Sequence, residues 1–229
     1  MKINPASYDE WYKSPFGALC HRLERDALFS LAGFRPGEFV LDAGCGIGVY
    51  LEEMRRLRVR AVGLDEDEDM LAYASRTRGY GADLVRARLQ ELPFKPCSLD
   101  KVLSVCALEF LPDPLPALKE LSGTLKDGGI LLLGFLNIDS PWARLRMEKG
   151  KQAASVWRGV RFYSLAEVAG IASGAGLSLC GHRGAVYFPP EAEGKETHEL
   201  FALEAGGSRA GGHPGFIATS FKRSGMPGI

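Results

Sequence analysis

The chain has 229 residues, of which 46% are hydrophobic and 24% are charged, and its 28 basic and 28 acidic residues give a formal net charge of zero. This composition is typical of a globular protein, and the length suits one α/β domain over residues 1–229 with a small cap. The balanced charge gives no support to binding of nucleic acid or a membrane surface, and no apolar run approaches the roughly 20 residues that would cross a bilayer.

The first predicted element is helical, and we assign residues 1–33 to a helical N-terminal cap. Aromatic side chains come first and apolar residues at helical spacing follow over residues 7–33: Tyr8, Trp11, Tyr12, Leu19, Leu23, Ala27, Leu28 and Leu31. The aromatic side chains either pack on the edge of a sheet or form a lid over a ligand. A Pro-Gly turn at residues 35–37 separates this element from the next.

A glycine-rich segment follows at residues 40–50, with the sequence VLDAGCGIGVY. Val40 and Leu41 close an apolar strand that ends at Asp42, and Tyr50–Leu57 has the pattern of a helix. Between them lie the residues of a tight turn: Gly44, Cys45, Gly46, Ile47 and Gly48. A strand, a glycine turn and a helix in this order let a nucleotide-like ligand approach the backbone and the start of the helix.

The spacing of these glycines separates two classes of ligand. A dinucleotide fingerprint needs a glycine where this chain has Val49, whereas Gly44, Gly46 and Gly48 simply alternate. With Asp42 two positions before the first glycine, the segment D-x-G-x-G-x-G resembles the cofactor loop of the class I S-adenosylmethionine (SAM)-dependent methyltransferases. Taken alone, the loop is also compatible with a turn that binds no ligand.

A second strand is predicted at Ala61–Leu64, and a run of acidic residues follows it. Asp65 stands at the strand end, about twenty residues after the glycine loop, where a carboxylate accepts both hydroxyls of a ribose. We therefore place Asp65 and the adjacent Glu66 in the cofactor site. Asp67 is expected to cap the next helix, because its side chain accepts from backbone amides of the first turn.

A third strand is predicted at Asp83–Arg86, and residues 86–94 then resemble the family segment that precedes an LPF tripeptide. The family often has an aspartate where this chain has Arg88, and that aspartate meets the amino group of adenine. The resemblance therefore implies an adenine contact from the backbone of Leu89 or from the side chain of Gln90.

A fourth strand is predicted at Asp100–Val105. It lies beside the first strand in this fold, so Ser104, Val105 and Cys106 are expected to line the cleft near the methionine end of the cofactor. Glu109 follows this strand and could face an acceptor, but a surface or capping role is the simpler interpretation.

The pattern next predicts a helix at Leu115–Leu125, a turn at residues 126–129 and a fifth strand at Ile130–Phe135. The sequence LKDGG at this turn resembles the LKPGG turn of the family. By itself it indicates a helix C-cap with glycine in the left-handed conformation.

Residues 136–163 are irregular and form a candidate substrate cover, in which Glu148 is the only acidic residue between positions 142 and 161. Their positive charge would favour an acidic or electron-rich acceptor. The alternative is a solvated amphipathic helix whose basic residues pair with acids elsewhere. The remaining predicted elements are a helix at Ser164–Ala175, strands at Leu177–Ala185 and Phe216–Lys222, a short helix near Glu196–Glu204 and a glycine-rich surface loop over residues 204–215.

The resemblance to one family covers residues 8–222 and rests on four motifs in the expected order: LDAGCGIG, GLD, LPF and LKDGG. The chain is identified as a member of the class I SAM-dependent methyltransferases of the small-molecule type, similar to the ubiquinone and menaquinone biosynthesis methyltransferases. The resemblance implies an α/β, Rossmann-like sheet of seven strands with helices on both faces. The sheet should be mostly parallel, with strand seven antiparallel between strands five and six.

The resemblance also implies SAM as cofactor, S-adenosylhomocysteine as product and a small-molecule acceptor, with no nucleic acid and no membrane insertion. The sequence YDEWY at residues 8–12 resembles the N-terminal segment that covers SAM in such enzymes. Cofactor-binding residues are therefore expected at these positions: Tyr12, Asp42, Gly44, Cys45, Gly46, Gly48, Asp65, Glu66, Leu89, Gln90, Ser104 and Val105.

The sequence specifies neither a catalytic residue nor a metal site. Its four histidines lack the spacing of metal ligands, and its five cysteines, without C-x-x-C spacing, indicate reduced thiols in a cytoplasmic protein. Two other functions stay open. One is a nucleotide-binding oxidoreductase, against which Val49 argues, and the other is a module that binds SAM or S-adenosylhomocysteine without catalysis.

Overall fold

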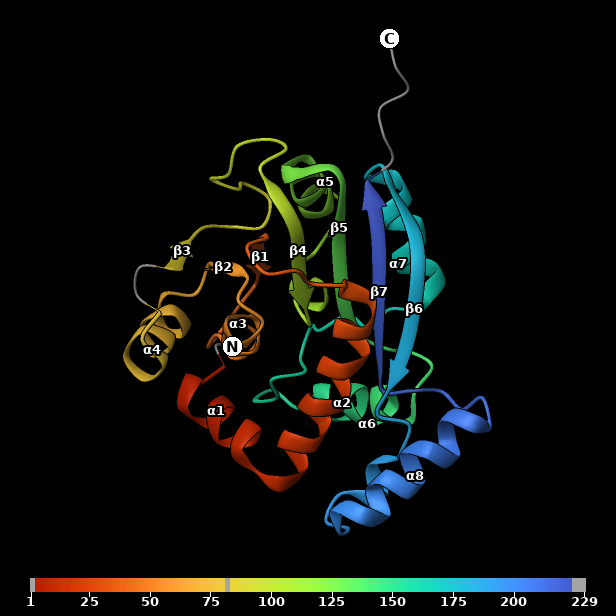
Figure 1. Ribbon diagram of the computed structural model, residues 1–229. Helices are drawn as coiled ribbons and strands as arrows, with labels where there is room; N and C mark the ends of the chain where they lie inside the picture. The colour runs from red at the N-terminus through yellow and green to blue at the C-terminus, as the bar shows by residue number, and fades with distance from the viewer. Residues whose placement is uncertain (1–2, 81–82, 224–229) are drawn as a thin grey trace.

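A computed structural model describes residues 3–80 and 83–223, where the strands form a seven-stranded sheet in the order β3-β2-β1-β4-β5-β7-β6. Neighbours from β3 to β5 pair in parallel, and β7 pairs antiparallel with both β5 and β6. The predicted Rossmann-like fold is therefore confirmed (Figure 1). The strands are β1 (Phe39–Ala43), β2 (Arg60–Asp65), β3 (Leu84–Arg86), β4 (Leu99–Val105), β5 (Leu125–Leu136), β6 (Leu177–Ala185) and β7 (Phe216–Arg223).

Helices cover both faces of the sheet because its central strands are apolar on both sides. Val40 and Leu103 belong to one core cluster, together with residues of α2 and α3, whereas Leu41 and Val102 belong to a second cluster with residues of α5 and α7. Alternate residues of a strand point to opposite faces, so an unbroken apolar run fills both cores. The helices are α1 (Pro5–Lys13), α2 (Pro15–Ala32), α3 (Val49–Arg56), α4 (Glu68–Arg78), α5 (Leu115–Thr124), α6 (Pro141–Gly150), α7 (Leu165–Gly174) and α8 (Thr197–Arg209).

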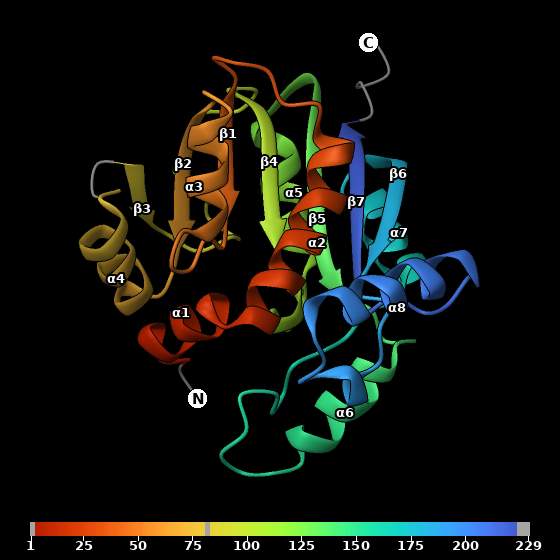
Figure 2. The same ribbon diagram turned by 60° about the horizontal axis from the view of Figure 1, so that its bottom comes forward.

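The N-terminal segment is helical as predicted, but a break that the prediction did not include divides it into two helices, α1 and α2. Ser14 precedes a proline and has an extended conformation, with φ −63° and ψ 149°, as expected for the residue before a proline. Its hydroxyl then caps α2 by accepting a 3.0 Å hydrogen bond from the amide of Gly17. Figure 2 shows the result: α2 runs along the sheet, while α1 crosses the end toward which β1, β2 and β4 point.

Two other boundaries differ from the prediction. The segment at residues 126–129 belongs to β5, where pairing with β4 shifts between Leu99 and Lys101, and the C-cap of α5 is Leu125 with φ −69° rather than a left-handed glycine. In addition, α8 continues into the glycine-rich stretch that was predicted to be a surface loop. It does so because Gly207 packs on Tyr187: a Cβ at Gly207 would lie 2.7 Å from the Cβ of Tyr187.

The position of β7 between β5 and β6 depends on close packing against β5. A Cβ at Gly134 would lie 2.4 Å from the ring of Phe216, so only glycine leaves room for that ring. The paired residues run from Ile130 with Lys222 to Leu136 with Phe216. The last described strand therefore locks between two strands that precede it in the sequence.

Candidate functional site

The glycine loop after β1 adopts the conformation that the glycine spacing predicts. Gly44, Gly46 and Gly48 all have positive φ values, of 81°, 51° and 77°, which residues with a Cβ rarely adopt. The amides of Gly44 and Cys45 donate hydrogen bonds of 2.7 and 2.9 Å to the carbonyl of Leu64 and fasten the loop to β2. The loop is thus a tight turn held at the carboxyl ends of two parallel strands.

The loop leaves space for a ligand beside its backbone. A Cβ built at Gly46 would meet no atom within 4 Å, whereas a Cβ at Gly44 would lie 2.9 Å from Ala107. Gly48 is the N-cap of α3, and no side chain caps this helix end. Because the first amides of a helix carry a partial positive charge, the open side of the loop favours a polar or anionic group.

Asp65 connects the loop to the next helix. Its carboxylate accepts hydrogen bonds from the amides of Gly46 (2.8 Å) and Asp67 (2.9 Å). Burial raises the pKa of Asp65, and these two hydrogen bonds oppose the shift. The prediction that Asp67 caps α4 is confirmed, because its Oδ1 accepts from the amides of Asp69 and Met70.

Asp42 is a buried carboxyl group at the base of the loop. It is 2% exposed, and its Oδ2 has no hydrogen-bond partner. Burial, reinforced by the charge of Asp65, raises the pKa of Asp42 to about 8. An unpartnered buried carboxyl needs either a proton or a cationic partner, so this position suits a ligand that brings a positive charge to the loop.

The N-terminal helices bring aromatic side chains to the same end of the sheet. The hydroxyls of Tyr8 and Tyr12 lie 3.1 Å apart. The ring of Tyr12 packs edge-on against His21 at 5.2 Å, and His21 packs against Tyr50 at 5.0 Å. Because Tyr50 lies in the first turn of α3, this aromatic row connects the cap to the glycine loop.

A buried aspartate fastens α1 to the body of the domain. Asp9 is 4% exposed and accepts hydrogen bonds from Arg78 (2.6 Å) and Tyr73 (2.9 Å), both on α4. Arg78 also pairs with Glu52 of α3 at 2.9 Å. Arg78 therefore joins α4 to both α1 and α3, which fastens α1 to the body of the domain.

The residues on the adenine side of the predicted site include an exposed ion pair. Glu66 and Arg88 are exposed and form an ion pair at 3.8 Å, so the arginine that replaces the family aspartate faces another charged residue. Leu89 is 8% exposed and Gln90 is half-buried. These residues follow β3 at the carboxyl edge of the sheet, where the sequence places them.

Near the predicted methionine end, the side chains mainly fix the backbone. The hydroxyl of Ser104 donates a 2.8 Å hydrogen bond to the carbonyl of Ala43, which joins β4 to β1. Cys45 is buried and its thiol lies 3.8 Å from the carbonyl of Gly46. Val105 is half-buried and packs against the core cluster on the α2 side. The structure thus brings the predicted residues to one edge of the sheet.

Sequence reasoning missed a group of buried charges at that edge. Glu109, predicted at the surface or in a cap, is 1% exposed in a 3₁₀ turn (Leu108–Phe110) directly after β4. Its Oε1 accepts a 2.7 Å hydrogen bond from the amide of Leu136, the last residue of β5, and its Oε2 has no partner. The available signal was a glutamate inside the apolar sequence ALEFL at a strand end.

The basic segment at residues 136–163 is also partly buried. It contains α6, whose Arg146 lies between the rings of Trp142 and Trp157, with its guanidinium carbon 5.3 and 4.9 Å from their centroids. Burial lowers the pKa of Arg146, and the charge of Glu24 on α2 is the largest effect that opposes this shift. This arginine therefore faces the interior, while Arg144 and Arg158 are exposed.

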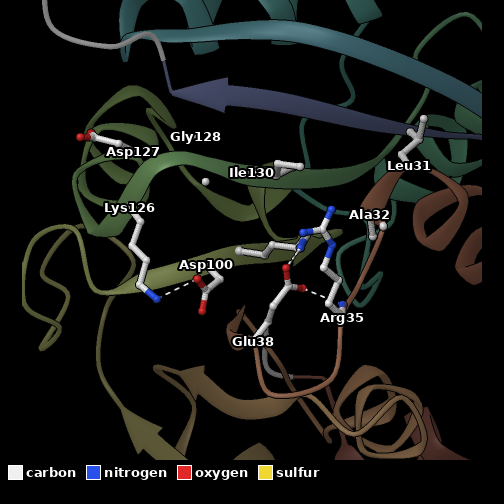
Figure 3. Close-up of a pocket in the computed structure, with 12 residues that line it drawn as sticks. Leu31, Ala32, Arg35, Glu38, Asp100, Lys126, Asp127, Gly128 and Ile130 are labelled. Atoms are coloured by element: carbon white, nitrogen blue, oxygen red, sulfur yellow. Dashed lines mark hydrogen bonds and ion pairs between the residues drawn. The ribbon is translucent and has the colours of Figure 1, made fainter.

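A cavity of about 390 Å³ lies at the opposite, amino-terminal edge of the strands (Figure 3). Four of its charged side chains form two ion pairs: Lys101 with Glu38, and Lys126 with Asp100 at 2.7 Å. The glycine loop and the buried charges are absent from its lining, so we do not assign it to the functional site. Within residues 3–80 and 83–223, no cluster of histidine, cysteine, aspartate and glutamate suits a metal ion, and no helix is long and apolar enough to span a membrane.

Several known proteins that resemble this chain are described as methyltransferases. The family described as Methyltransferase domain matches residues 41–133, which include the glycine loop and Asp65. An uncharacterized protein of Mycobacterium tuberculosis is 32% identical over 220 residues, which cover 94% of this chain and 70% of that protein. A ubiquinone biosynthesis O-methyltransferase of Hahella chejuensis is 29% identical over 168 residues, which cover 67% of this chain and 68% of that enzyme.

Solved structures with the same fold agree with these relatives. A SAM-dependent methyltransferase of Thermotoga maritima, described as a possible histamine N-methyltransferase, has a TM-score of 0.71 at 23% identity and covers 96% of this chain and 95% of its own. The geranyl diphosphate C-methyltransferase of Streptomyces coelicolor, solved with S-adenosylhomocysteine, has a TM-score of 0.62 at 16% identity and covers 89% of this chain and 80% of its own.

Proposed function

The chain belongs to the class I SAM-dependent methyltransferases, with SAM as cofactor, and we propose that it methylates a small-molecule acceptor bound at the carboxyl edge of the sheet. One observation carries this proposal. An open glycine position, Gly46, lies in the loop that begins beside the buried carboxyl of Asp42, whose Oδ2 has no partner. The open space lets a ligand approach the backbone of the loop, and the carboxyl favours the positive charge that SAM carries.

The residues around the loop fit the parts of SAM. In our assignment, Asp42 faces the positively charged methionine part, Asp65 accepts from the ribose hydroxyls, and Leu89 and Gln90 border the adenine. Tyr12 covers the site from α1. The complete set proposed for the cofactor is Tyr12, Asp42, Gly44, Cys45, Gly46, Gly48, Asp65, Glu66, Leu89, Gln90, Ser104 and Val105.

When bound, SAM supplies a methyl group on a positively charged sulfur, which is already a good electrophile. The chain must then orient the acceptor and exclude water, and good orientation alone can lower the barrier by several kcal/mol, up to roughly 7–11 kcal/mol. The cap formed by α1 and α2, fastened through Asp9, and the partly buried segment at residues 136–163 are the parts that we propose for this task. We propose that residues 1–229 act as one domain.

Calorimetry with SAM, S-adenosylhomocysteine and NAD tests the cofactor assignment. We expect binding of the first two and no comparable binding of NAD. Gly46→Val should abolish SAM binding, because its Cβ would enter the open space and its φ of 51° strains any residue with a side chain. Unchanged SAM affinity in Gly46→Val, or tighter binding of NAD than of SAM, would contradict the assignment. A protein that binds SAM but methylates nothing would instead be the non-catalytic module.

A further inference from the structure

Three charged side chains from separate elements interact electrostatically, and two of these elements follow β4 and β5 at the carboxyl edge of the sheet. Glu24 comes from α2, Glu109 from the 3₁₀ turn after β4, and Arg146 from α6. Arg146 favours the ionised form of both glutamates, and Glu109 disfavours the ionised form of Glu24. We refer to Glu24, Glu109 and Arg146 as the acidic cluster.

Within the acidic cluster, Glu109 has one fixed oxygen and one free oxygen. The amide of Leu136 holds Oε1 at 2.7 Å, which sets the orientation of the carboxyl group. Oε2 is buried and has no hydrogen-bond partner among the described residues. A buried carboxylate oxygen without a partner is costly, so this atom favours a proton or a hydrogen-bond donor.

The acidic cluster carries more negative than positive charge when it is ionised. In the described part of the chain, Arg146 is the one cation that acts on both glutamates, and no ion pair within 4.0 Å joins it to either. Burial raises the pKa of both Glu24 and Glu109 to about 7. The other titratable groups that face Glu109 are uncharged at neutral pH, since burial raises their pKa values: Tyr8, Cys106 and Tyr163.

This charge argues against the sequence-based hypothesis of an acidic acceptor. That hypothesis rested on the basic residues between positions 142 and 161, yet most of these side chains are exposed: Arg144, Lys149, Lys151, Arg158 and Arg161. A negatively charged acceptor beside Glu109 would add a third anion to a buried site. A positively charged acceptor would instead compensate the glutamate that Arg146 leaves unbalanced.

The acidic cluster acts electrostatically on a tyrosine that follows the glycine loop. Tyr50, which follows the loop at the start of α3, feels the charges of both Glu24 and Asp42. Its hydroxyl is buried without a partner. Tyr50 therefore connects Glu24 of the acidic cluster electrostatically with Asp42 of the glycine loop.

We propose that the acceptor is a protonated amine whose nitrogen binds between Glu24 and the free Oε2 of Glu109, and that Glu109 removes its proton. This inference rests on the proposed methyltransferase function. One N–H bond of the ammonium group breaks, its proton moves to Oε2 of Glu109, and the electron pair stays on nitrogen. That pair forms the new nitrogen–carbon bond as the carbon–sulfur bond of the sulfonium breaks, with its electrons left on sulfur.

The first test identifies the atom that receives the methyl group. SAM carrying a CD₃ group is incubated with the protein and a small-metabolite extract, and labelled products are characterised by mass spectrometry. We expect the label on nitrogen. A label on oxygen, carbon or sulfur overturns the amine proposal and leaves the methyltransferase function intact. SAM binding by calorimetry without any labelled product overturns both.

The second test uses the labelled amine and measures its binding as well as its turnover. Calorimetry with S-adenosylhomocysteine present, in two buffers of different ionisation enthalpy, reports affinity and proton transfer together. We expect Glu109→Gln to weaken amine binding by at least about 10-fold, to lower kcat by about 100-fold or more and to remove the rise of kcat/KM with pH near 7. The amide side chain keeps an oxygen for Leu136, which favours folding.

Two further variants separate the roles within the acidic cluster. Glu24→Gln should raise KM for the amine more than it lowers kcat, because Glu24 binds the cation without taking its proton. Glu191→Gln, at an exposed glutamate, is the matched control and should change neither parameter. If Glu109→Gln retains the affinity, kcat and pH profile of the parent protein, the proposed role of Glu109 is wrong.

Discussion

The amide of Gly46 donates a 2.8 Å hydrogen bond to the carboxylate of Asp65, so the glycine loop and the end of β2 form one unit. The two residues were predicted to bind different parts of the cofactor. Their contact means that a change at the ribose position also alters the loop, and the effects of the two changes on SAM binding should not be additive.

We expect Asp65→Ala to weaken SAM binding by roughly 10- to 150-fold, because a hydrogen bond to a charged group contributes about 1.5–3 kcal/mol and each 1.4 kcal/mol is a factor of ten. Asp67→Ala should instead cost about 0.5–2 kcal/mol of stability through loss of the α4 cap. Calorimetry and urea unfolding of both variants separate the two effects. Equal losses of SAM affinity in the two variants would contradict the different roles assigned to them.

SAM binding should release a proton from Asp42 at neutral pH. Burial raises the pKa of this group to about 8, so the free protein holds it mainly protonated at pH 7, while a cationic ligand favours the carboxylate. Affinity should therefore rise as the pH increases from about 6 to 8. Calorimetry in two buffers measures the released proton, and Asp42→Asn is expected to remove it. Proton uptake on binding would contradict this assignment.

The two glutamates of the acidic cluster should make the protein less stable as pH rises. Burial raises their folded-state pKa values from the ordinary 4.5 to about 7. Between these values the two glutamates bind more protons in the folded chain than in the unfolded chain, so their contribution to stability declines as pH increases from about 5 to 7 and then levels off. Thermal melts across this range should show a falling Tm, and Glu24→Gln should flatten part of the fall. A Tm that rises over this interval would be inconsistent with buried neutral glutamates.

The contact between Asp9 and Arg78 should control how firmly α1 covers the site. We expect Asp9→Asn to lower the free energy of unfolding by about 1–3 kcal/mol, because it weakens the largely buried ion pair between Asp9 and Arg78. Arg78 then keeps its ion pair with Glu52. Amide exchange in α1 should accelerate, and SAM should dissociate faster. Glu10→Gln, at an exposed neighbour on the same helix, is the control. Unchanged exchange in α1 would show that other contacts hold the cap.

The parts of the site that follow from the sequence are those made by consecutive residues. The turn from Gly44 to Gly48 and the capping role of Asp67 depend on local backbone geometry, which residue type and spacing predict directly. The sheet order followed from a resemblance that involved several motifs at once. In contrast, the break at Ser14 was missed although its cause, Pro15, is local.

The acidic cluster could not be predicted, because its members are far apart in the sequence. Glu109 is buried because β4 and β5 bring it next to Leu136, and Arg146 is half-buried because it lies between the rings of Trp142 and Trp157. A sequence pattern assigns isolated charged residues to the surface. The burial of such groups is known only from the tertiary contacts that exclude solvent from them.

The insertion of β7 between β5 and β6 has a consequence for the order in which the protein forms during synthesis. Leu136 of β5 pairs with Phe216 of β7, so β5, β7 and β6 can join only after nearly all described residues have been synthesised. Until then, β5 and β6 present unpaired backbone groups that another chain can join. A chain in which β7 has not yet paired therefore has two strand edges that are open to pairing with another chain.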